Sequence, residues 1–256
     1  MFYNTKIIDY GDYLHIEFFD KAIRRNETGE DIDEIKEKLK NEEKKKEIIE
    51  DNDKQDQEHS NKVSVNRSKN NLFRIARSNE WDLFITLTFD RKQVDSSDYK
   101  EVSKLVTRFL DKLRRYNPCM KYLIVPELHK DKTHYHFHGL LYNANLDLIN
   151  SGKVDKDGEV IYNVNDWTWG FSTAMRIKSQ SAVRNYIGKY ITKELMNKLK
   201  YKKRYYASQN VNVCDEELSM MKIDEIYDLY GDNLSYIKTI DVNGYNRIKY
   251  LEIKKD

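Results

Sequence analysis

The 256-residue sequence has little of what marks secreted, membrane-spanning or disulfide-stabilised proteins. It contains two cysteines, Cys119 and Cys214, which lie far apart and not in a metal-binding spacing. No hydrophobic run approaches the roughly 20 apolar residues that span a bilayer. Charged residues interrupt the first 20 positions, unlike the apolar core of a signal peptide. We therefore expect a cytoplasmic protein with reduced thiols and no membrane partner.

A Gly-rich phosphate-binding loop of the form G-x-x-x-x-G-K-[S/T] is also absent from the sequence. This absence gives no support to a built-in helicase. Any unwinding of a nucleic acid would therefore fall to a host partner.

Charge is abundant but unevenly distributed, with 34% charged residues and a formal net charge of +2. Residues 27–58 hold 14 Asp or Glu against 7 Lys, which predicts a charged helical or disordered insertion over 27–60. Residues 172–206 hold ten Lys or Arg against one Glu, so we expect a polyanionic partner, most simply nucleic acid. The DNA-binding residues predicted from this block are Arg176, Lys178, Arg184, Lys202, Lys203 and Arg204.

The alternation of apolar and polar positions predicts an α+β domain built on a central antiparallel sheet with flanking helices. We expect a single domain over 1–256, with a catalytic core over 62–210 that the helix and hairpin of 211–256 complete. Residues 144–166 are rich in Gly, Asp and Asn and are predicted to be a loop, and 215–230 a helix. The other predicted elements are strands or hairpins at 6–19, 81–90, 121–128 and 133–143, helices at 64–78 and 179–199, and a last hairpin that turns at Asn243-Gly244.

The stretch HYHFHGLL places His134, His136 and His138 at every second position, so on a strand all three would share one face. Glu127 lies in the preceding predicted strand and can come opposite His136 across a tight turn. Two imidazoles and one carboxylate leave coordination positions open for water or phosphate oxygens. With no thiolate present, the donor set favours Mn²⁺ or Mg²⁺, and zinc is an alternative. The histidine pair could instead be His134 and His136, and His129 could replace Glu127.

The stretch NYIGKYITKEL places Tyr186, Lys189, Tyr190 and Lys193 on one stripe of a predicted helix. At 100° per residue, the two tyrosines lie about 40° apart around the helix axis. Lysines beside a phenol stabilise its phenolate and face a place where phosphate could bind. Together with a divalent cation held by histidines, this stripe predicts nucleophilic attack on a phosphodiester.

Three ordered segments, FITLTF (84–89), HFHGLL (136–141) and YIGKYITK (186–193), resemble the motifs of the HUH replication initiators, in which U is a hydrophobic residue. The segments WTWGF and RYYASQN also resemble sequences that flank the third motif in replication-associated proteins of small phages and plasmids. The doubled Tyr-x-x-Lys is similar to the two-tyrosine arrangement of microvirus gene A initiators. The resemblance covers about residues 64–210.

This resemblance implies an RRM-like, ferredoxin-type core with about five antiparallel strands and the metal site at its centre. It implies cleavage of single-stranded origin DNA with a 5′-phosphotyrosyl link and a free 3′-hydroxyl for a host polymerase. His136 and His138 match the paired ligands, which the family follows with Gly or a hydrophobic run. Tyr186 matches the nucleophile and Tyr190 the second one, and Lys189 and Lys193 match the motif lysines.

Three other activities share some of these features. A single-tyrosine HUH transposase usually has a shorter chain, and a conjugative relaxase usually has its tyrosine before the histidines. A non-catalytic single-stranded DNA-binding protein would use the basic block and stacking aromatics such as Tyr201, Tyr205 and Tyr206, without the histidine row.

Overall fold

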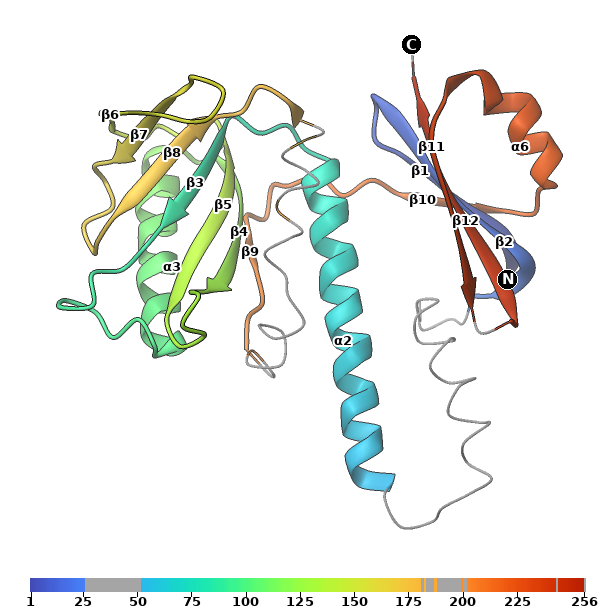
Figure 1. The fold of residues 1–256 in the computed structure, drawn as a ribbon, viewed down its shortest axis with the longest axis horizontal. Helices are drawn as coiled ribbons and strands as arrows, with labels where there is room; N and C mark the ends of the chain where they lie inside the picture. Colours follow the sequence, from blue (N-terminus) through green and yellow to red (C-terminus); the bar gives the residue numbers. More distant parts are fainter. Residues whose placement is uncertain are drawn as a thin grey trace. The chain divides into compact units, whose positions relative to one another are not determined.

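The computed structural model describes residues 1–25, 52–180, 182, 187, 199, 202–242 and 244–255. The chain divides into two compact units (Figure 1). The terminal unit comprises Met1–Arg67 and Val213–Asp256, and the central unit comprises Ser68–Asn212. The central unit has nearly the bounds predicted for the catalytic core, 62–210. That the whole chain acts as one nicking domain stays a prediction.

The terminal unit is a five-stranded antiparallel sheet in the order β10-β1-β2-β12-β11. The expected first hairpin is confirmed, with a turn at Gly11, whose φ of +90° suits glycine. Ile16, Phe18 and Leu251 form a small core with Ile226 of the single α-helix described after the central unit. The elements are β1 (Phe2–Asp9), β2 (Tyr13–Arg24), β10 (Glu216–Ser219), α6 (Ile223–Tyr230), η2 (Gly231–Asn233), β11 (Leu234–Val242) and β12 (Asn246–Lys254).

The predicted helix over 215–230 is too long. Residues 216–219 form β10, which pairs with β1, and the helix begins only at Ile223. Pairing with an existing strand edge outweighs the local helical preference of this acidic segment. The hairpin predicted at Asn243-Gly244 is confirmed by the pairing of β11 with β12.

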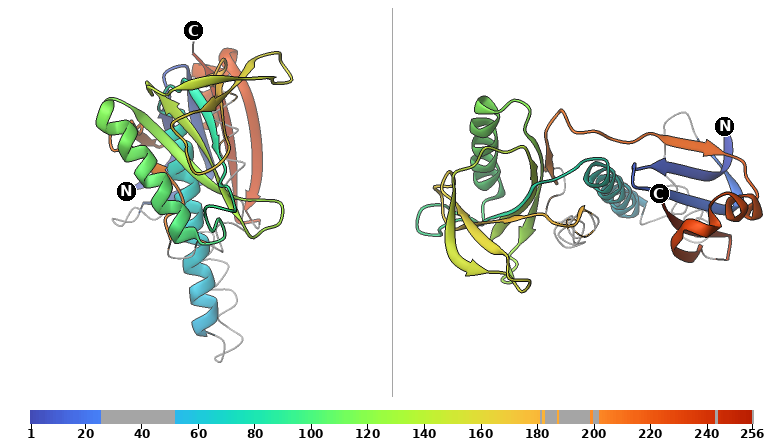
Figure 2. Two further views of the ribbon diagram at one scale, coloured as in Figure 1. Left: turned by 90° about the vertical axis from the view of Figure 1, so that its left-hand side faces the viewer. Right: turned by 90° about the horizontal axis from the view of Figure 1, so that it is seen from above.

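The central unit contains a seven-stranded antiparallel sheet in the order β6-β7-β8-β3-β5-β4-β9 (Figure 2). One helix, α3 (Tyr99–Tyr116), covers one face of this sheet. The strands are β3 (Leu83–Leu87), β4 (Lys121–Leu128), β5 (Tyr135–Tyr142), β6 (Leu148–Val154), β7 (Val160–Val164), β8 (Ser172–Arg176) and β9 (Tyr206–Ala207). The α+β class and the antiparallel pairing are therefore confirmed.

The expected number of about five strands is wrong for this sheet, because the predicted loop over 144–166 forms the hairpin of β6 and β7. Its polar residues have specific places in that hairpin. Gly158 has a φ of +81° in the turn, and Gly152 lies where the register shifts between Asn150 and Lys153. Turn and bulge residues therefore hid two short strands that pair through their backbones.

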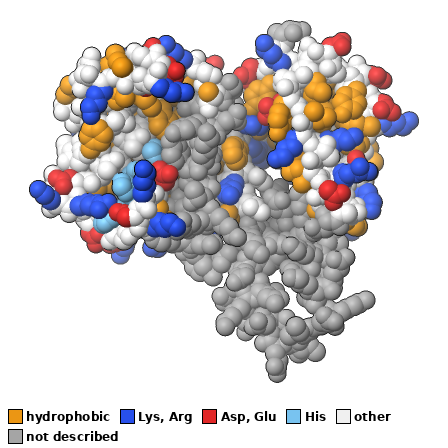
Figure 3. Space-filling view, viewed as in Figure 1, with side chains coloured by type: hydrophobic (Ala, Val, Ile, Leu, Met, Phe, Trp, Pro, Cys, Tyr) orange, Lys and Arg blue, Asp and Glu red, His pale blue; other side chains and the backbone are white. Residues whose placement is uncertain are grey.

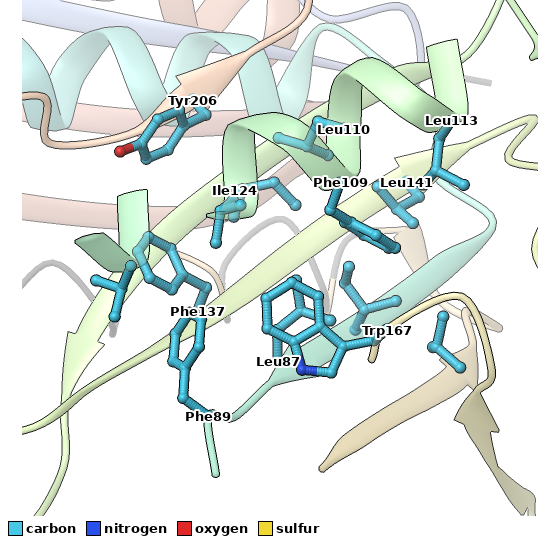
Figure 4. Close-up of a cluster of buried hydrophobic side chains, with 14 of the residues drawn as sticks. Leu87, Phe89, Phe109, Leu110, Leu113, Ile124, Phe137, Leu141, Trp167 and Tyr206 are labelled. Atoms are coloured by element: carbon cyan, nitrogen blue, oxygen red, sulfur yellow. The ribbon is translucent and has the colours of Figure 1, made fainter. Parts of the chain in front are cut away.

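The core of the central unit forms between α3 and one face of the sheet (Figure 4). The buried side chains of α3 repeat at helical spacing and include Val102, Val106, Phe109, Leu110 and Leu113. They pack with Tyr135, Phe137 and Leu141 of β5 and with Trp167. Each such buried side chain stabilises the fold by roughly 1.5–3 kcal/mol. Because alternate residues of a strand face opposite ways, the histidines of β5 point away from α3.

Helix α2 (Asn52–Arg77) begins inside the predicted charged insertion and includes the basic helix expected at 64–78. The rest of that insertion, 26–51, lies outside the described residues, as does most of the helix predicted at 179–199. Within the part of the chain that the structure describes, no helix is both long enough and apolar enough to cross a membrane.

Candidate metal centre

The hairpin of β4 and β5 positions the candidate metal ligands. Its register pairs Glu127 with His136 and Val125 with His138, so the predicted opposition of Glu127 and His136 is confirmed. Strand β3 lies on the other side of β5 and pairs Thr86 with His138. The candidate site therefore spans three adjacent strands in the middle of the sheet.

Three donor atoms converge on this face of the sheet. The Nε2 atoms of His136 and His138 each lie 2.7 Å from Oε2 of Glu127. The three residues offer one ligand atom each, and these atoms lie within 4.8 Å of one another. Since metal–ligand bonds are about 2.0–2.6 Å long, one cation can bridge donors at this separation. Within the described ranges, this is the one group of three or more His, Cys, Asp or Glu residues that could hold a metal ion.

The hydrogen bonding of the cluster is incomplete without a cation. His138 donates or accepts at Glu127 with acceptable geometry, but the equally short approach of His136 Nε2 is not aligned as a hydrogen bond. That nitrogen is buried, and a buried polar atom without a partner is costly. The residues therefore fit a divalent cation, which would use the lone pairs that the protein leaves unpaired.

Thr86 and Phe84 of β3 hold the ring of His138. Thr86 Oγ1 lies 3.1 Å from His138 Nδ1, and the Phe84 ring stacks on the imidazole with centroids 5.8 Å apart. In the tautomer protonated at Nδ1, the hydroxyl accepts that proton's hydrogen bond and leaves the Nε2 lone pair for a cation. Sequence analysis missed this role, although a hydroxyl between the apolar residues of FITLTF was a usable signal.

The electrostatics of the cluster favour cation binding. Burial alone would raise the pKa of Glu127, but hydrogen bonds and charge from His136 and His138 lower it to about 2. Burial lowers the pKa of His138, against the opposing hydrogen bond from Glu127. An ionised carboxylate and a neutral imidazole are the forms that bind metal, so both are present near neutral pH.

The two alternative ligands lie outside the cluster. His134 precedes β5, and its Nδ1 lies 2.9 Å from Ser96 Oγ. His129 is in the turn, with its Nδ1 3.8 Å from Asp131 Oδ2. The structure thus brings together Glu127, His136 and His138, and it separates His134 from the other two because the regular strand begins at Tyr135.

The predicted catalytic residues Tyr186, Lys189, Tyr190 and Lys193 lie outside the described residues, as does Arg184. The other predicted DNA-binding residues do not form one surface. Lys178 pairs with Glu159 at 2.5 Å near the β7–β8 edge, where Arg176 ends β8. Arg204 Nη1 donates to Ser68 Oγ at 3.1 Å. Lys202 and Lys203 instead line a groove beside α3.

Residues 82–195 match the family model of the replication-associated protein ORF2. The matched segment contains Glu127, His136 and His138, and it extends over the two predicted nucleophile positions, 186 and 190. The match supports a protein of the replication-initiator type. Comparison with curated proteins and with solved structures gives no match.

Proposed function

We propose that this chain is a metal-dependent, sequence-specific single-stranded DNA endonuclease and strand transferase of the HUH type. It would nick a replication origin to start rolling-circle replication and transfer the strand again to end it. The observation that carries this proposal is the convergence of Glu127, His136 and His138 within the segment that matches a replication-associated family. The match supports replication, and the donor set supports phosphodiester chemistry.

In this proposal Glu127, His136 and His138 hold a divalent cation, Mn²⁺ or Mg²⁺. When bound, that cation supplies polarisation of a phosphodiester and stabilises negative charge on its oxygens. Glu127 also contributes a negative charge, which lets the site bind a dication and still retain net positive charge for phosphate. Thr86 keeps the imidazole of His138 in the required tautomer and orientation.

The nucleophile in this proposal is the phenol oxygen of Tyr186, with Tyr190 as a second nucleophile. A bond forms between the tyrosine oxygen and phosphorus, and the bond from phosphorus to the 3′-oxygen breaks. The phenol proton is lost, and the departing 3′-oxygen gains a proton to become a free hydroxyl. Lys189 and Lys193 stabilise the phenolate and neutralise phosphate charge.

The partners in this proposal follow from its products. The free 3′-hydroxyl is a primer for a host DNA polymerase, and a host helicase would separate the strands. Two tyrosines allow the second to attack the regenerated origin while the first still holds the original 5′ end. That exchange would end a round of replication without releasing the covalent link.

The proposal can be tested by trapping the covalent adduct. Purified protein is incubated with Mn²⁺ and labelled single-stranded DNA from beside its gene, and the adduct is mapped by peptide mass spectrometry. We expect the phosphotyrosine at Tyr186 and, in Tyr186→Phe, at Tyr190. The double Phe variant should form no adduct, while Tyr205→Phe, outside the predicted stripe, serves as the control.

Two results would contradict the proposal. A protein that binds this DNA but forms no adduct with any divalent cation would be a non-catalytic single-stranded DNA-binding protein. An adduct that persists in the double Phe variant would place the nucleophile elsewhere in the chain.

A further inference from the structure

The outer face of α3 carries a basic groove on the side of the sheet away from the metal ligands. The groove is open, has a volume of about 1030 Å³, and is lined by one face of α3 and by residues 202, 203 and 206. At 100° per residue, its lining positions on α3 are centred about 180° from the buried stripe. In Figure 3, histidine side chains are visible on the face toward the viewer, whereas α3 lies behind the sheet in the same view of Figure 1.

Cations of one sign line this groove. Five come from α3, and Lys202 and Lys203 add two more beside its first turns, against the single acidic lining residue Asp111. Lys202 Nζ lies 5.6 Å from the centre of the Tyr99 ring, and Lys203 Nζ lies 4.6 Å from that of Tyr206. The five cations on α3 are Lys100, Lys104, Arg108, Lys112 and Arg115.

The spacing of these cations is unfavourable for the helix itself. Lys100, Lys104, Arg108 and Lys112 follow one another at every fourth position, where like charges repel across a turn. Lys100 also lies in the first turn, near the positive end of the helix dipole. A merely solvated helix face would mix both signs, so this arrangement indicates a surface selected to bind an anion.

Most of these cations have no acidic partner. Lys112 Nζ lies 3.4 Å from Asp166 Oδ1. Lys100, Lys104, Arg108 and Arg115 make no ion pair within 4.0 Å among the residues that the structure describes. Their charge is therefore available to an external ligand. The row from Lys100 to Arg115 is about 22 Å long at 1.5 Å per residue, which suits an extended polyanion rather than a single phosphate.

We propose that the α3 groove binds the phosphodiester backbone of DNA, at a surface separate from the metal centre. The aromatic rings at the groove, Tyr99 and Tyr206, are buried, so they cannot stack on bases. Contacts made by Lys and Arg to phosphate alone fix position without reading sequence. This surface would hold DNA flanking the cleavage site, whether single-stranded or duplex, while the opposite face of the sheet engages the scissile phosphate.

The role in flanking DNA rests on the proposed nicking function, but binding at the groove can be measured without it. Fluorescence anisotropy with labelled DNA of arbitrary sequence, single-stranded or duplex, is measured in EDTA so that no cleavage occurs. The test variant is Lys104→Gln with Arg108→Gln. The matched control, Lys153→Gln with Lys156→Gln, removes the same charge from the exposed β6–β7 hairpin.

At 0.1 M salt each lost phosphate contact weakens binding about 5-fold on a single strand and about 8-fold on a duplex. We therefore expect the test variant to bind about 25-fold more weakly to single strands, or about 60-fold to duplex, whichever the groove holds. The slope of log affinity against log salt should fall by about 1.4 or about 1.8, respectively. Gln has nearly the helix propensity of Lys and Arg, so circular dichroism should show unchanged helix content.

Equal affinities of the wild type and the test variant for both DNAs would overturn the inference, even if the wild type forms a covalent adduct. Equal losses in the test and control variants would also overturn it, because only general charge would then matter. Conversely, a loss confined to the test variant supports the groove even if no adduct ever forms. Binding of phosphatidylserine vesicles that needs Lys104 and Arg108, with unchanged DNA binding, would assign the groove to a lipid surface instead.

Discussion

Replacing Thr86 by Val removes one hydroxyl from beside the candidate metal ligands and leaves the shape of the side chain nearly unchanged. Thr86 Oγ1 lies 3.1 Å from His138 Nδ1, and the ring of His138 is only 7% exposed. Water therefore has little access to replace the lost partner. We expect this substitution to weaken metal binding rather than to unfold the protein.

The magnitude follows from the cost of leaving that nitrogen unpaired. A buried donor without a partner costs about 1–3 kcal/mol, which corresponds to a factor of roughly 5 to 150 in affinity. Loss of a residue that orients a metal ligand typically lowers metal affinity about 10- to 100-fold. Both estimates predict Mn²⁺ affinity at least about 10-fold weaker in Thr86→Val.

Isothermal titration calorimetry of Mn²⁺ into the metal-free protein measures this change, and urea unfolding reports stability separately. Thr86→Ser keeps a hydroxyl and should restore most of the affinity. Thr173→Val is a matched control, because Thr173 pairs with Thr86 on the neighbouring strand β8. Wild-type Mn²⁺ affinity in Thr86→Val would refute the role assigned to this hydroxyl.

Two further predictions concern stability. Gly170 has a φ of +149°, and a Cβ there would overlap the backbone of Thr88 and Asp90, so Gly170→Ala should lower the free energy of unfolding by at least about 2 kcal/mol. Gly158→Ala, at φ +81° with open space around it, should cost less in the same urea titration, and the reverse order would contradict the packing argument. The pKa of His138 is lowered in the fold, so the metal-free protein should lose stability as pH falls below the ordinary value of 6.5. Urea titrations at pH 7.5 and 5.5 should show a smaller loss for His138→Asn, and an equal loss would show that this ring is not responsible.

The sequence predicted the metal cluster well because its signal is local. Alternation along one strand and a four-residue turn were enough to place Glu127 opposite His136. What the alternation could not predict is that His134 falls before the regular strand and contacts Ser96 instead. That contact depends on a loop 38 residues earlier in the chain, which no local pattern encodes.

Other parts of the fold were hidden for the same reason. The strands β6 and β7 are short, and their Gly, Asp and Asn residues resemble a loop until the backbone pairing is known. Strand β10 gains its conformation from pairing with β1, more than 200 residues away in the sequence. The role of Thr86 also depends on a neighbouring strand, since its partner His138 is 52 residues distant.

The most direct test of metal-dependent nicking compares the wild type with the variant His136→Ala, His138→Ala on labelled single-stranded origin DNA. With Mn²⁺, the wild type should form a covalent adduct and a free 3′-hydroxyl end, and EDTA should abolish both. The double variant should form neither, yet it should bind the DNA with nearly wild-type affinity, because lysines and arginines supply most of that affinity. Adduct formation by the double variant in the presence of EDTA would contradict the account.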